Sequence, residues 1–287
     1  MRSGFSATSA TRRGLALVTG ASTGIGRATA RLLASSGYRV FATARTPEAE
    51  ATLRQDGSME VLRLDVGDEA AVTRTVHEVL DRAGRVDALV NNAGYALVGA
   101  TEDLTRDLLR RQFEVNVFGA MQLCREVLPS MRARRSGRIV NVSSLAGRVS
   151  VPMMGAYCAS KFALEAFTDA LRVEARPFGV GVALVEPGPV VTEFQRNALA
   201  VSRDVLTSDS VYRSVYRSYV DSFFEMGRGA TPERVARVIR RALNAGRPRS
   251  RYRVRLIDSV ATGFIQITPR RAMDWVLSRW MALDSVR

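Results

Sequence analysis

A short apolar run, a glycine-rich turn and a helical pattern follow one another directly near the start of the chain. Residues 15–18 (LALV) are all apolar, as in a parallel strand that is buried on both faces. They lead into residues 19–26 (TGASTGIG), after which apolar side chains recur at helical spacing as far as Ser36. A strand that passes through glycines into a helix predicts an α/β domain with a phosphate site at the helix N-terminus.

The glycines of this turn have separate uses. Gly20 permits a tight turn, whereas Gly24 and Gly26 let the backbone approach a pyrophosphate and let the helix pack on the strand. We expect these turn residues to contact a dinucleotide: Gly20, Ser22, Thr23, Gly24, Ile25 and Gly26.

Apolar runs alternate with helical patterns along most of the chain. Further strands are predicted at 38–43, 61–64, 86–90, 138–142, 180–185 and 252–257, and helices at 68–83, 106–134 and 157–176. Connections of this length suit right-handed crossovers. The expected fold is therefore a Rossmann-type, doubly wound parallel sheet in a single domain over residues 14–250.

Composition limits the setting of this domain. No run of about 18 apolar residues is present, so no membrane span is predicted. Cys124 and Cys158 fall in predicted helices rather than in a spaced framework, which favours a reduced, cytoplasmic setting. His77 is the only histidine, and a lone histidine predicts no metal site.

Tyr157 and Lys161 are four residues apart in a predicted helix, so their side chains share one face. A nearby ammonium favours phenolate and would lower the tyrosine pKa toward the working range of a general acid or base. The chain has 42 basic residues, of which Lys161 is the only lysine. Its survival indicates a place where a compact ammonium is needed and a planar guanidinium fails.

Ser143 and Ser144 come at the end of the predicted strand before this helix. A serine hydroxyl both donates and accepts, so it can hold a carbonyl or alcohol oxygen beside the phenol. Ser144, Tyr157 and Lys161 resemble the Ser-Tyr-Lys set of the classical short-chain dehydrogenase/reductase family, with Ser143 as the alternative register. Residues 157–165 (YCASKFALE) and 188–190 (GPV) are most similar to its 17β-hydroxysteroid and retinol dehydrogenase branch.

The resemblance implies roles for individual residues. Tyr157 would be the acid/base, Lys161 would lower its pKa and bind the nicotinamide ribose, and Ser144 would position the substrate oxygen. Asn116 matches the family's active-site asparagine, which binds a water of the proton relay to the lysine. Contacts with the cofactor are further implied for Asp65, Val66, Asn92, Ala93, Gly94, Tyr157, Lys161, Pro187, Gly188, Val190 and Thr192.

Cofactor preference depends on Arg45. It follows the second predicted strand, about 20 residues past the glycine turn, where an acid would bind the adenosine ribose of NAD. An arginine without a carboxylate beside it can hold a ribose 2′-phosphate instead. We therefore predict NADPH/NADP+, with NADH/NAD+ as the alternative if Arg45 is only a solvated side chain.

Residues 193–229 are expected to form a lid that selects the substrate. Tyr212, Tyr216 and Tyr219 suggest an amphipathic helix over the site, or one that packs on the core or a second subunit. The predicted substrate contacts are Ser144, Val149, Met154, Tyr157 and Phe194. They favour a small molecule that is a bulky apolar ketone or alcohol. The alternatives are a 3-oxoacyl-thioester reductase and a non-catalytic, cofactor-binding regulatory or scaffold protein.

The two ends of the chain differ from the domain between them. Residues 1–13 are rich in Ser, Thr and Arg, and predict a disordered basic extension. Residues 251–287 predict a basic C-terminal extension with the last strand and an amphipathic helix. From residue 228 onward, 14 arginines face four acids. This pattern suits a peripheral membrane contact, a homodimer or homotetramer contact, or a flap over the pocket, and no motif supports nucleic acid.

Overall fold

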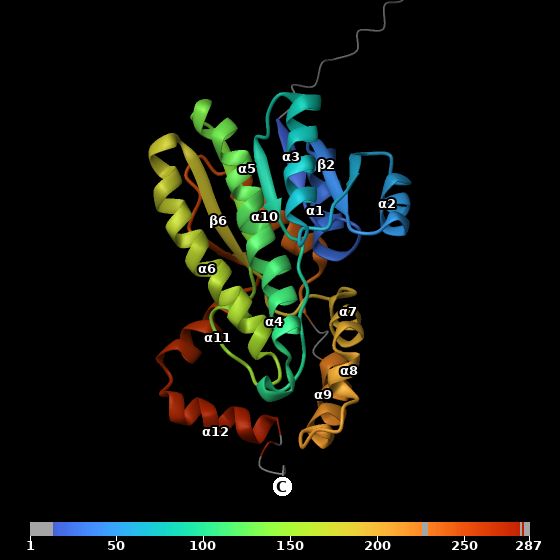
Figure 1. Ribbon diagram of the computed structural model, residues 1–287. Coiled ribbons are helices and arrows are strands. Elements are labelled where there is room, and N and C mark those ends of the chain that lie inside the picture. Colours follow the sequence, from blue (N-terminus) through green and yellow to red (C-terminus); the bar gives the residue numbers. More distant parts are fainter. Residues whose placement is uncertain (1–13, 226–228, 282, 284–287) are drawn as a thin grey trace, which may run out of the picture.

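A parallel sheet of seven strands forms the centre of the computed structural model, which describes residues 14–225, 229–281 and 283 (Figure 1). The strands lie in the order β3-β2-β1-β4-β5-β6-β7. Their bounds are β1 Leu15–Val18, β2 Arg39–Ala44, β3 Glu60–Arg63, β4 Ala88–Asn91, β5 Gly137–Val142, β6 Val180–Glu186 and β7 Arg251–Arg253. The order reverses between β1 and β4, and the carboxyl ends of strands beside such a switch point form the usual ligand site of this fold.

Helices cover both faces of the sheet, which confirms the predicted doubly wound fold. Alternate residues of each strand point to opposite faces, so in β1 Ala16 and Val18 join one apolar cluster while Leu15 and Leu17 join another. The first cluster lies under α1 Gly24–Ser35, α2 Pro47–Arg54 and α10 Pro232–Asn244. The second lies under α3 Glu69–Ala83, α5 Gly119–Ala133 and α6 Gly155–Ala175.

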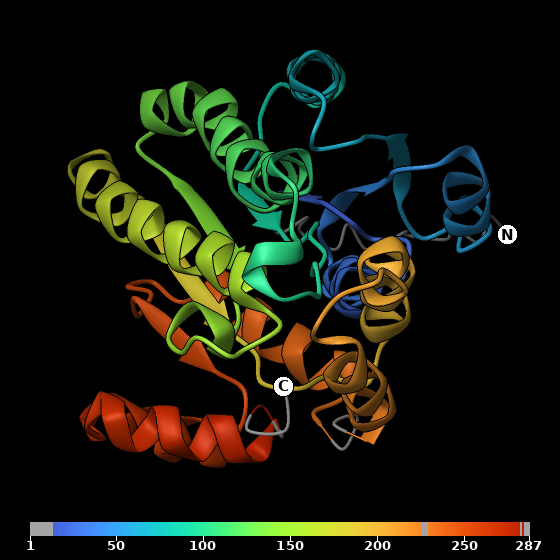
Figure 2. The ribbon, with the colours of Figure 1, turned by 60° about the horizontal axis from the view of Figure 1, so that its bottom comes forward.

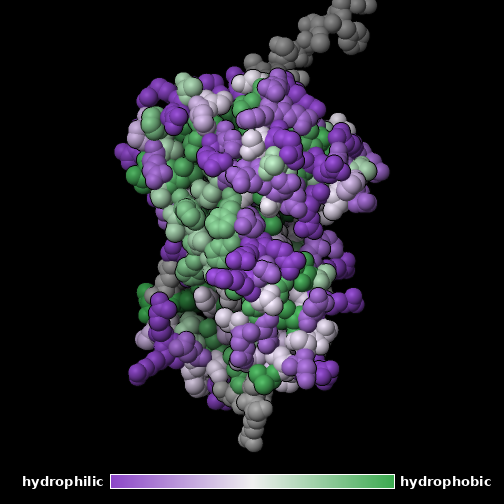
Figure 3. Space-filling model, in the orientation of Figure 1, coloured by the Kyte–Doolittle hydropathy of each residue, from purple (hydrophilic) through white to green (hydrophobic). Residues whose placement is uncertain are grey.

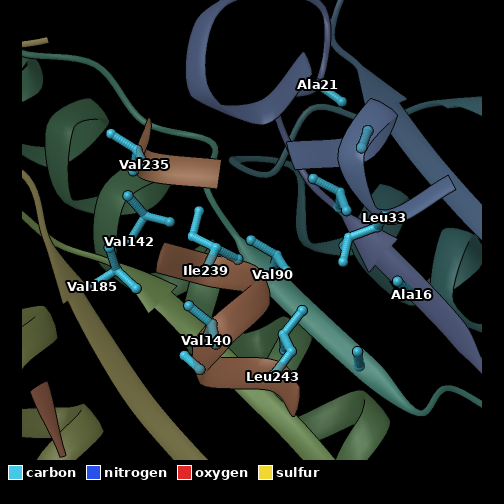
Figure 4. Close-up of a cluster of buried hydrophobic side chains, with 14 of the residues drawn as sticks. Ala16, Ala21, Leu33, Val90, Val140, Val142, Val185, Val235, Ile239 and Leu243 are labelled. Carbon is cyan, nitrogen blue, oxygen red and sulfur yellow. The ribbon is translucent and has the colours of Figure 1, made fainter. Parts of the chain in front are cut away.

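Helix α10 shows how the chain after the lid returns to the sheet. Thr231 caps its first turn by accepting from the backbone N–H of Arg234, and Pro232 follows as the first helical residue. Its buried face places Val235, Ile239 and Leu243 against the strands and against α1, as Figure 4 shows. The segment after the lid is therefore part of the main core.

The helix predicted at 106–134 is interrupted in its middle. The structure has α4 Arg106–Phe113, a π-helical turn at Glu114–Phe118 and then α5. Gly119 begins α5 where a Cβ atom would lie only 2.1 Å from the carbonyl oxygen of Val66. Neither this close contact between backbones nor the wider π-helical turn before it changes the spacing of apolar residues in the sequence, so the pattern predicted one continuous helix.

The strand predicted at 252–257 is wrong in its second half. In this part of the chain the strand β7 ends at Arg253, and α11 Leu256–Ile267 begins three residues later. Arg255 and Asp258 form a capping box that starts this helix, and their side chains also make an ion pair at 2.7 Å. Apolar residues that looked like an alternating strand are thus the first turn of a helix.

The remaining helices lie at the carboxyl edge of the sheet and beyond it. The predicted lid contains α7 Phe194–Val201, α8 Arg203–Leu206 and α9 Arg213–Glu225, and the chain continues after α11 into α12 Arg270–Trp280. No helix among the described residues is long and apolar enough to cross a membrane. Residues 1–13, expected to be a disordered extension, lie outside the described residues, as do 226–228 of the lid.

Candidate active site

Tyr157 and Lys161 lie one turn apart on α6 and are both buried. The Lys161 ammonium is 5.8 Å from the centre of the Tyr157 ring. It donates a hydrogen bond of 2.9 Å to the backbone carbonyl oxygen of Val142, at the end of β5. The helix face that the sequence predicted therefore holds both side chains against the carboxyl edge of the sheet.

The two serines after β5 point in different directions. Ser144 forms a side-chain hydrogen bond with Tyr157, and its Oγ also accepts from the backbone N–H of Ala146 at 3.1 Å. Ser143 lies beside Glu165 instead, and Gly147 packs against both. The structure thus brings Ser144, and not Ser143, to the phenol.

Burial sets the acidity of this pair. It raises the pKa of Tyr157 to about 12, and the hydrogen bond from Ser144 opposes that rise. Burial lowers the pKa of Lys161 to about 8, and the nearby Glu165 carboxylate opposes that fall. Burial therefore outweighs the lowering of the tyrosine pKa that we expected, because a buried phenolate loses its contacts with water and the hydrogen bond with Ser144 replaces them only in part.

Asn116 lies in the π-helical turn and is buried. Its side-chain oxygen accepts from the backbone N–H of Tyr95, while its side-chain nitrogen donates to the carbonyl oxygen of Tyr95 and to Ser160 Oγ. A Cβ atom on Gly94 would lie 3.0 Å from this oxygen and 3.8 Å from the Lys161 ammonium. Asn116 and Lys161 thus flank the same glycine. Tyr95 was not predicted, because its contribution here is made by its backbone.

The glycine turn after β1 leaves a free helix N-terminus. Gly20 and Gly24 have φ angles of 63° and 53°, which favour glycine. At Gly26 a Cβ atom would lie 2.2 Å from the carbonyl oxygen of Gly20, so only glycine fits. Thr23 makes no capping bond with α1, whereas the residues before α2, α3, α4 and α10 cap those helices. The open N–H groups and the cradle of glycines fit a dinucleotide pyrophosphate.

The segment after β4 fixes this turn in place. Asn92 donates through its side chain to the carbonyl oxygens of Thr19 and Gly20, at 3.0 Å and 3.1 Å. The backbone N–H groups of Asn92 and Ala93 both donate to Thr19 Oγ1. Strands β1 and β4 therefore meet at their carboxyl ends through one polar cluster.

The residues predicted to bind the adenosine part of the cofactor follow strands β2 and β3. Arg45 is exposed just after β2, and Asp65 is exposed two residues after β3, where its carboxylate accepts from the backbone N–H of Gly67. Val66 beside it is buried. Burial raises the pKa of Tyr95, and the positive charges of Arg111 and Arg45 oppose that rise. Arg111 on α4 was not predicted, since an arginine among many carries no signal of its own.

The loop after β6 packs against the glycine turn and against α11. Pro187 and Val190 are buried, and Thr192 packs against Gly24 of the glycine turn, where a Cβ atom would meet its methyl group at 3.0 Å. Gly188 lies against the carboxylate of Asp258 from α11. The loop and the glycine turn, more than 160 residues apart in sequence, thus lie against each other.

An apolar cluster surrounds Tyr157. The Phe194 ring is 5.7 Å from the Tyr157 ring, and Met154 packs on the same cluster. Val149, predicted with them, is half-buried in the loop after Gly147, outside the cluster. Sequence alone did not predict Met281, which follows α12 and is buried in the cluster.

The predicted lid packs on this cluster rather than standing clear of it. Tyr216 is fully buried, and its hydroxyl donates to Asp103 and accepts from the backbone N–H of Ala100. Tyr219 is buried in the same cluster, and burial raises its pKa. The tyrosine stripe of α9 therefore forms part of the apolar cluster around Tyr157.

A buried polar cluster lies behind the tyrosine helix. Arg251 of β7 bridges Glu165, two turns after Tyr157 on α6, and Glu186 at the end of β6, with nitrogen–oxygen distances of 3.0 Å to each. Burial raises the pKa of Glu165 to about 7. Residues this far apart in sequence gave no pattern that predicts their meeting.

A doubly wound sheet with a glycine cradle and a Ser-Tyr-Lys set at its carboxyl edge defines a class, the nicotinamide-dependent oxidoreductases that act on alcohols and carbonyls. Residues 14–201 match the family model for short chain dehydrogenase. The chain belongs to the short-chain dehydrogenase/reductase family, and it is an oxidoreductase acting on CH–OH or C=O groups with a nicotinamide cofactor.

The chain is similar to several named oxidoreductases. The chain is 37% identical to 17-beta-hydroxysteroid dehydrogenase type 1 of Homo sapiens, over 84% of this chain and 77% of that protein. It is 36% identical to retinol dehydrogenase 8 of Bos taurus, over 90% and 85%. It is 40% identical to 3-ketodihydrosphingosine reductase of Bacteroides thetaiotaomicron, over 63% of this chain and 65% of that protein.

Solved structures support the same placement. A metagenomic short-chain oxidoreductase in complex with NADP is 31% identical, with a TM-score of 0.66, over 85% of this chain and 98% of that chain. A Burkholderia phymatum short-chain dehydrogenase/reductase in complex with NAD is 28% identical, with a TM-score of 0.75, over 87% and 91%.

Proposed function

We propose that this protein is an NADPH-dependent reductase of bulky apolar ketones, able to run in reverse on secondary alcohols. The observation that carries the proposal is the apolar cluster around Tyr157, in which Phe194, Met281 and the lid tyrosines leave few polar partners for a substrate beyond the reacting oxygen. A polar substrate such as a sugar would lose its water contacts there without replacement. The names of the steroid, retinol and ketodihydrosphingosine relatives agree with this choice.

The proposed direction, reduction, agrees with the protonation of Tyr157 and with the charge of Arg45. Burial raises the pKa of Tyr157, so its phenol carries a proton at neutral pH that it can give to the substrate oxygen. Arg45 stands exposed where a 2′-phosphate of NADPH would be bound. Ser22, Thr23, Ile25 and the uncapped turn of α1 would hold the pyrophosphate, and Thr192 would meet the carboxamide of the nicotinamide.

Each residue of the candidate set then has one task. The bound cofactor supplies the hydride to the carbonyl carbon. Ser144 and Tyr157 hold the carbonyl oxygen between their hydroxyls, and Tyr157 gives that oxygen its phenolic proton, so that the C=O bond becomes CH–OH. Lys161 binds the nicotinamide ribose, and Asn116 anchors the water through which the tyrosine regains a proton.

We also propose a homodimer or homotetramer in the cytoplasm. Both cysteines are free and buried, as suits a reducing compartment. Phe118, Phe162 and Phe167 are exposed at the end of the π-helical turn and along α6. Apolar side chains gather on that side of the molecule, as Figure 3 shows, and such patches often mark contacts between proteins.

The test is a substrate panel with the purified full-length protein. NADPH consumption is followed with a steroid ketone, retinal, 3-ketodihydrosphingosine and a 3-oxoacyl thioester. Turnover of one or more of the first three, with slow or no turnover of the thioester, supports the proposal. Preference for the thioester would favour the alternative reductase. Tight NADPH binding with no turnover of any carbonyl would contradict the proposed role of Tyr157.

A further inference from the structure

Helix α11 carries a row of large apolar side chains that faces away from the protein. They are Leu256, Ile257, Val260, Phe264 and Ile267, all exposed, with exposed fractions of 81% at Leu256 and 79% at Ile267. Their spacing places them on one side of the helix. A helix of a globular protein normally buries such a stripe in the core, so this one lacks a partner within the described residues.

Helix α12 adds tryptophan and arginine to this surface. Trp275, Val276 and Trp280 are exposed, and no residue of α12 is buried. Arg270, Arg271 and Arg279 are exposed beside them, with the Arg279 guanidinium 5.3 Å from the Trp275 ring. Figures 1 and 2 both show α12 lying apart from the sheet and its covering helices. We call the exposed residues of these two helices the α11–α12 surface.

Charge distinguishes between two occupants of this surface. A second copy in a symmetric contact would bring the same three arginines of α12 from each partner together, against a single exposed acid, Asp274, from each. An anionic bilayer offers the opposite charge at its headgroups and an apolar layer directly beneath them. Tryptophan prefers that boundary, and amphipathic helices with arginine on them lie in it.

We propose that the α11–α12 surface docks on an anionic lipid bilayer. The apolar row of α11 and the two tryptophans enter the boundary between headgroups and acyl chains. Arg270, Arg271 and Arg279 remain at the phosphates. The chain net charge of +14 draws the protein to the same surface from a distance.

Both ends of this segment touch the candidate active site. Asp258, in the first turn of α11, is buried against Gly188 of the loop that is expected to cover the nicotinamide. Met281, just after α12, is buried in the apolar cluster that contains Tyr157. Docking would therefore hold the pocket at the membrane, where an apolar ketone dissolved in the bilayer is concentrated. This last step rests on the proposed function, whereas the docking itself does not.

The test of docking uses the two tryptophans as built-in probes. The chain contains no others, so its tryptophan emission reports only on α12. The full-length protein is mixed with vesicles of phosphatidylcholine alone, or of phosphatidylcholine with phosphatidylglycerol. We expect a blue shift of the emission and co-sedimentation with the anionic vesicles, and a marked weakening of both in neutral vesicles or high salt.

Two pairs of variants separate the apolar contribution from the charged one. The double variant Ile257→Asp/Phe264→Asp should weaken vesicle binding at least tenfold, whereas Val173→Asp, at an equally exposed apolar position on α6, should leave it unchanged. The double variant Arg270→Glu/Arg271→Glu should remove the preference for anionic lipid, whereas Arg74→Glu on α3 should keep it. All four positions or pairs are exposed, and circular dichroism checks that each variant is folded.

The outcomes separate the proposal from its rivals. If anionic vesicles change neither the tryptophan emission nor the sedimentation of the protein, the docking proposal is wrong. A blue shift that appears with rising protein concentration alone, and disappears in Ile257→Asp/Phe264→Asp, would assign the surface to a second copy and also overturn it. Vesicle binding without reduction of any apolar ketone would uphold docking and overturn its link to substrate delivery.

Discussion

The ammonium of Lys161 donates a hydrogen bond to the backbone carbonyl oxygen of Val142 over 2.9 Å. This bond ties the middle of the tyrosine helix to the end of β5, immediately before the two serines. The lysine thus has a structural task besides its charge. It fixes the distance between the element that carries Tyr157 and the element that carries Ser144.

Replacing Lys161 by arginine separates charge from shape. The site is buried and is bordered by Gly94 and Asn116, so a planar guanidinium will not fit where the ammonium lies. We expect Lys161→Arg to lower kcat by on the order of 10²-fold or more, within the range of lost acid–base catalysis. The measurement is steady-state turnover, with a thermal melt to check folding. Unchanged turnover in a folded variant would mean that a guanidinium can replace the ammonium of Lys161.

Removing the phenolic hydroxyl of Tyr157 should abolish proton donation without emptying the cavity. Tyr157→Phe keeps the ring that packs on Phe194, so folding and NADPH affinity should stay within a few-fold of the parent protein. Turnover should fall by roughly 10²- to 10⁴-fold. Tyr219→Phe is the matched control, because it removes a hydroxyl from the same apolar cluster. Similar losses in both variants would mean that the cluster, rather than the hydroxyl of Tyr157, matters.

The preference for NADPH is expected to depend on Arg45. Arg45→Asp replaces a phosphate ligand by a carboxylate, which repels a 2′-phosphate and can accept from a ribose hydroxyl. Titration of the protein fluorescence with NADPH and NADH should show NADPH favoured in the parent and NADH favoured in the variant. Arg63→Asp, at an exposed arginine at the end of β3, serves as the control. Equal binding of both cofactors by the parent protein would mean that Arg45 is only a solvated side chain.

The sequence predicted those features of the structure that depend on residues close to one another in the chain. The strand, turn and helix from Leu15 to Ser35, and the shared face of Tyr157 and Lys161, depend on residues only a few positions apart. The choice between Ser143 and Ser144 could not be made from sequence with certainty, since neighbours in an extended segment point to opposite sides. Only the packing of α6 decides which side meets the phenol.

Other features depend on contacts between distant residues and were missed. The wide turn that holds Asn116 is associated with Gly119 approaching Val66, more than fifty residues earlier. The meeting of Arg251 with Glu165 requires β7 to lie beside β6. The start of α11 was misjudged because Leu256, Ile257 and Val260 are exposed, so their pattern does not reflect burial in a sheet.

The lid should be held closed mainly by one tyrosine hydroxyl. Tyr216 bonds to Asp103 and to the backbone N–H of Ala100, so Tyr216→Phe leaves a buried donor without its acceptor. We expect the free energy of unfolding to fall by about 1–3 kcal/mol. Tyr212→Phe, immediately before α9, removes a hydroxyl that bonds to the exposed Glu102 and should cost less than about 0.5 kcal/mol. Urea denaturation measures both, and equal losses would contradict this role of Tyr216.

The buried carboxylate of Glu165 should make stability depend on pH near neutrality. Burial is the largest cause that raises its pKa from 4.5 to about 7, and the Ser143 hydroxyl and Arg251 only partly offset it. Between these two values the folded protein binds more protons at this site than the unfolded chain does. The free energy of unfolding should therefore fall as the pH rises from about 4.5 to about 7, by on the order of 1–3 kcal/mol from this group.

The side chain in the variant Glu165→Gln cannot ionise, so its free energy of unfolding should not show the fall between pH 4.5 and about 7. Denaturant melts of the variant and the parent across this pH range measure the difference. Asp169→Asn is the matched control, because Asp169 also binds Arg251. Although burial acts against it, the bonds to Arg251 lower the pKa of Asp169 below 3.8, so its stabilisation is lost only as the pH falls through that lower value. The control should thus lower the stability by a constant amount through neutrality and change the slope of the curve only in acid. If the curves of Glu165→Gln and the parent run parallel through neutrality, Glu165 is ionised throughout, and Arg251 outweighs the cost of its burial.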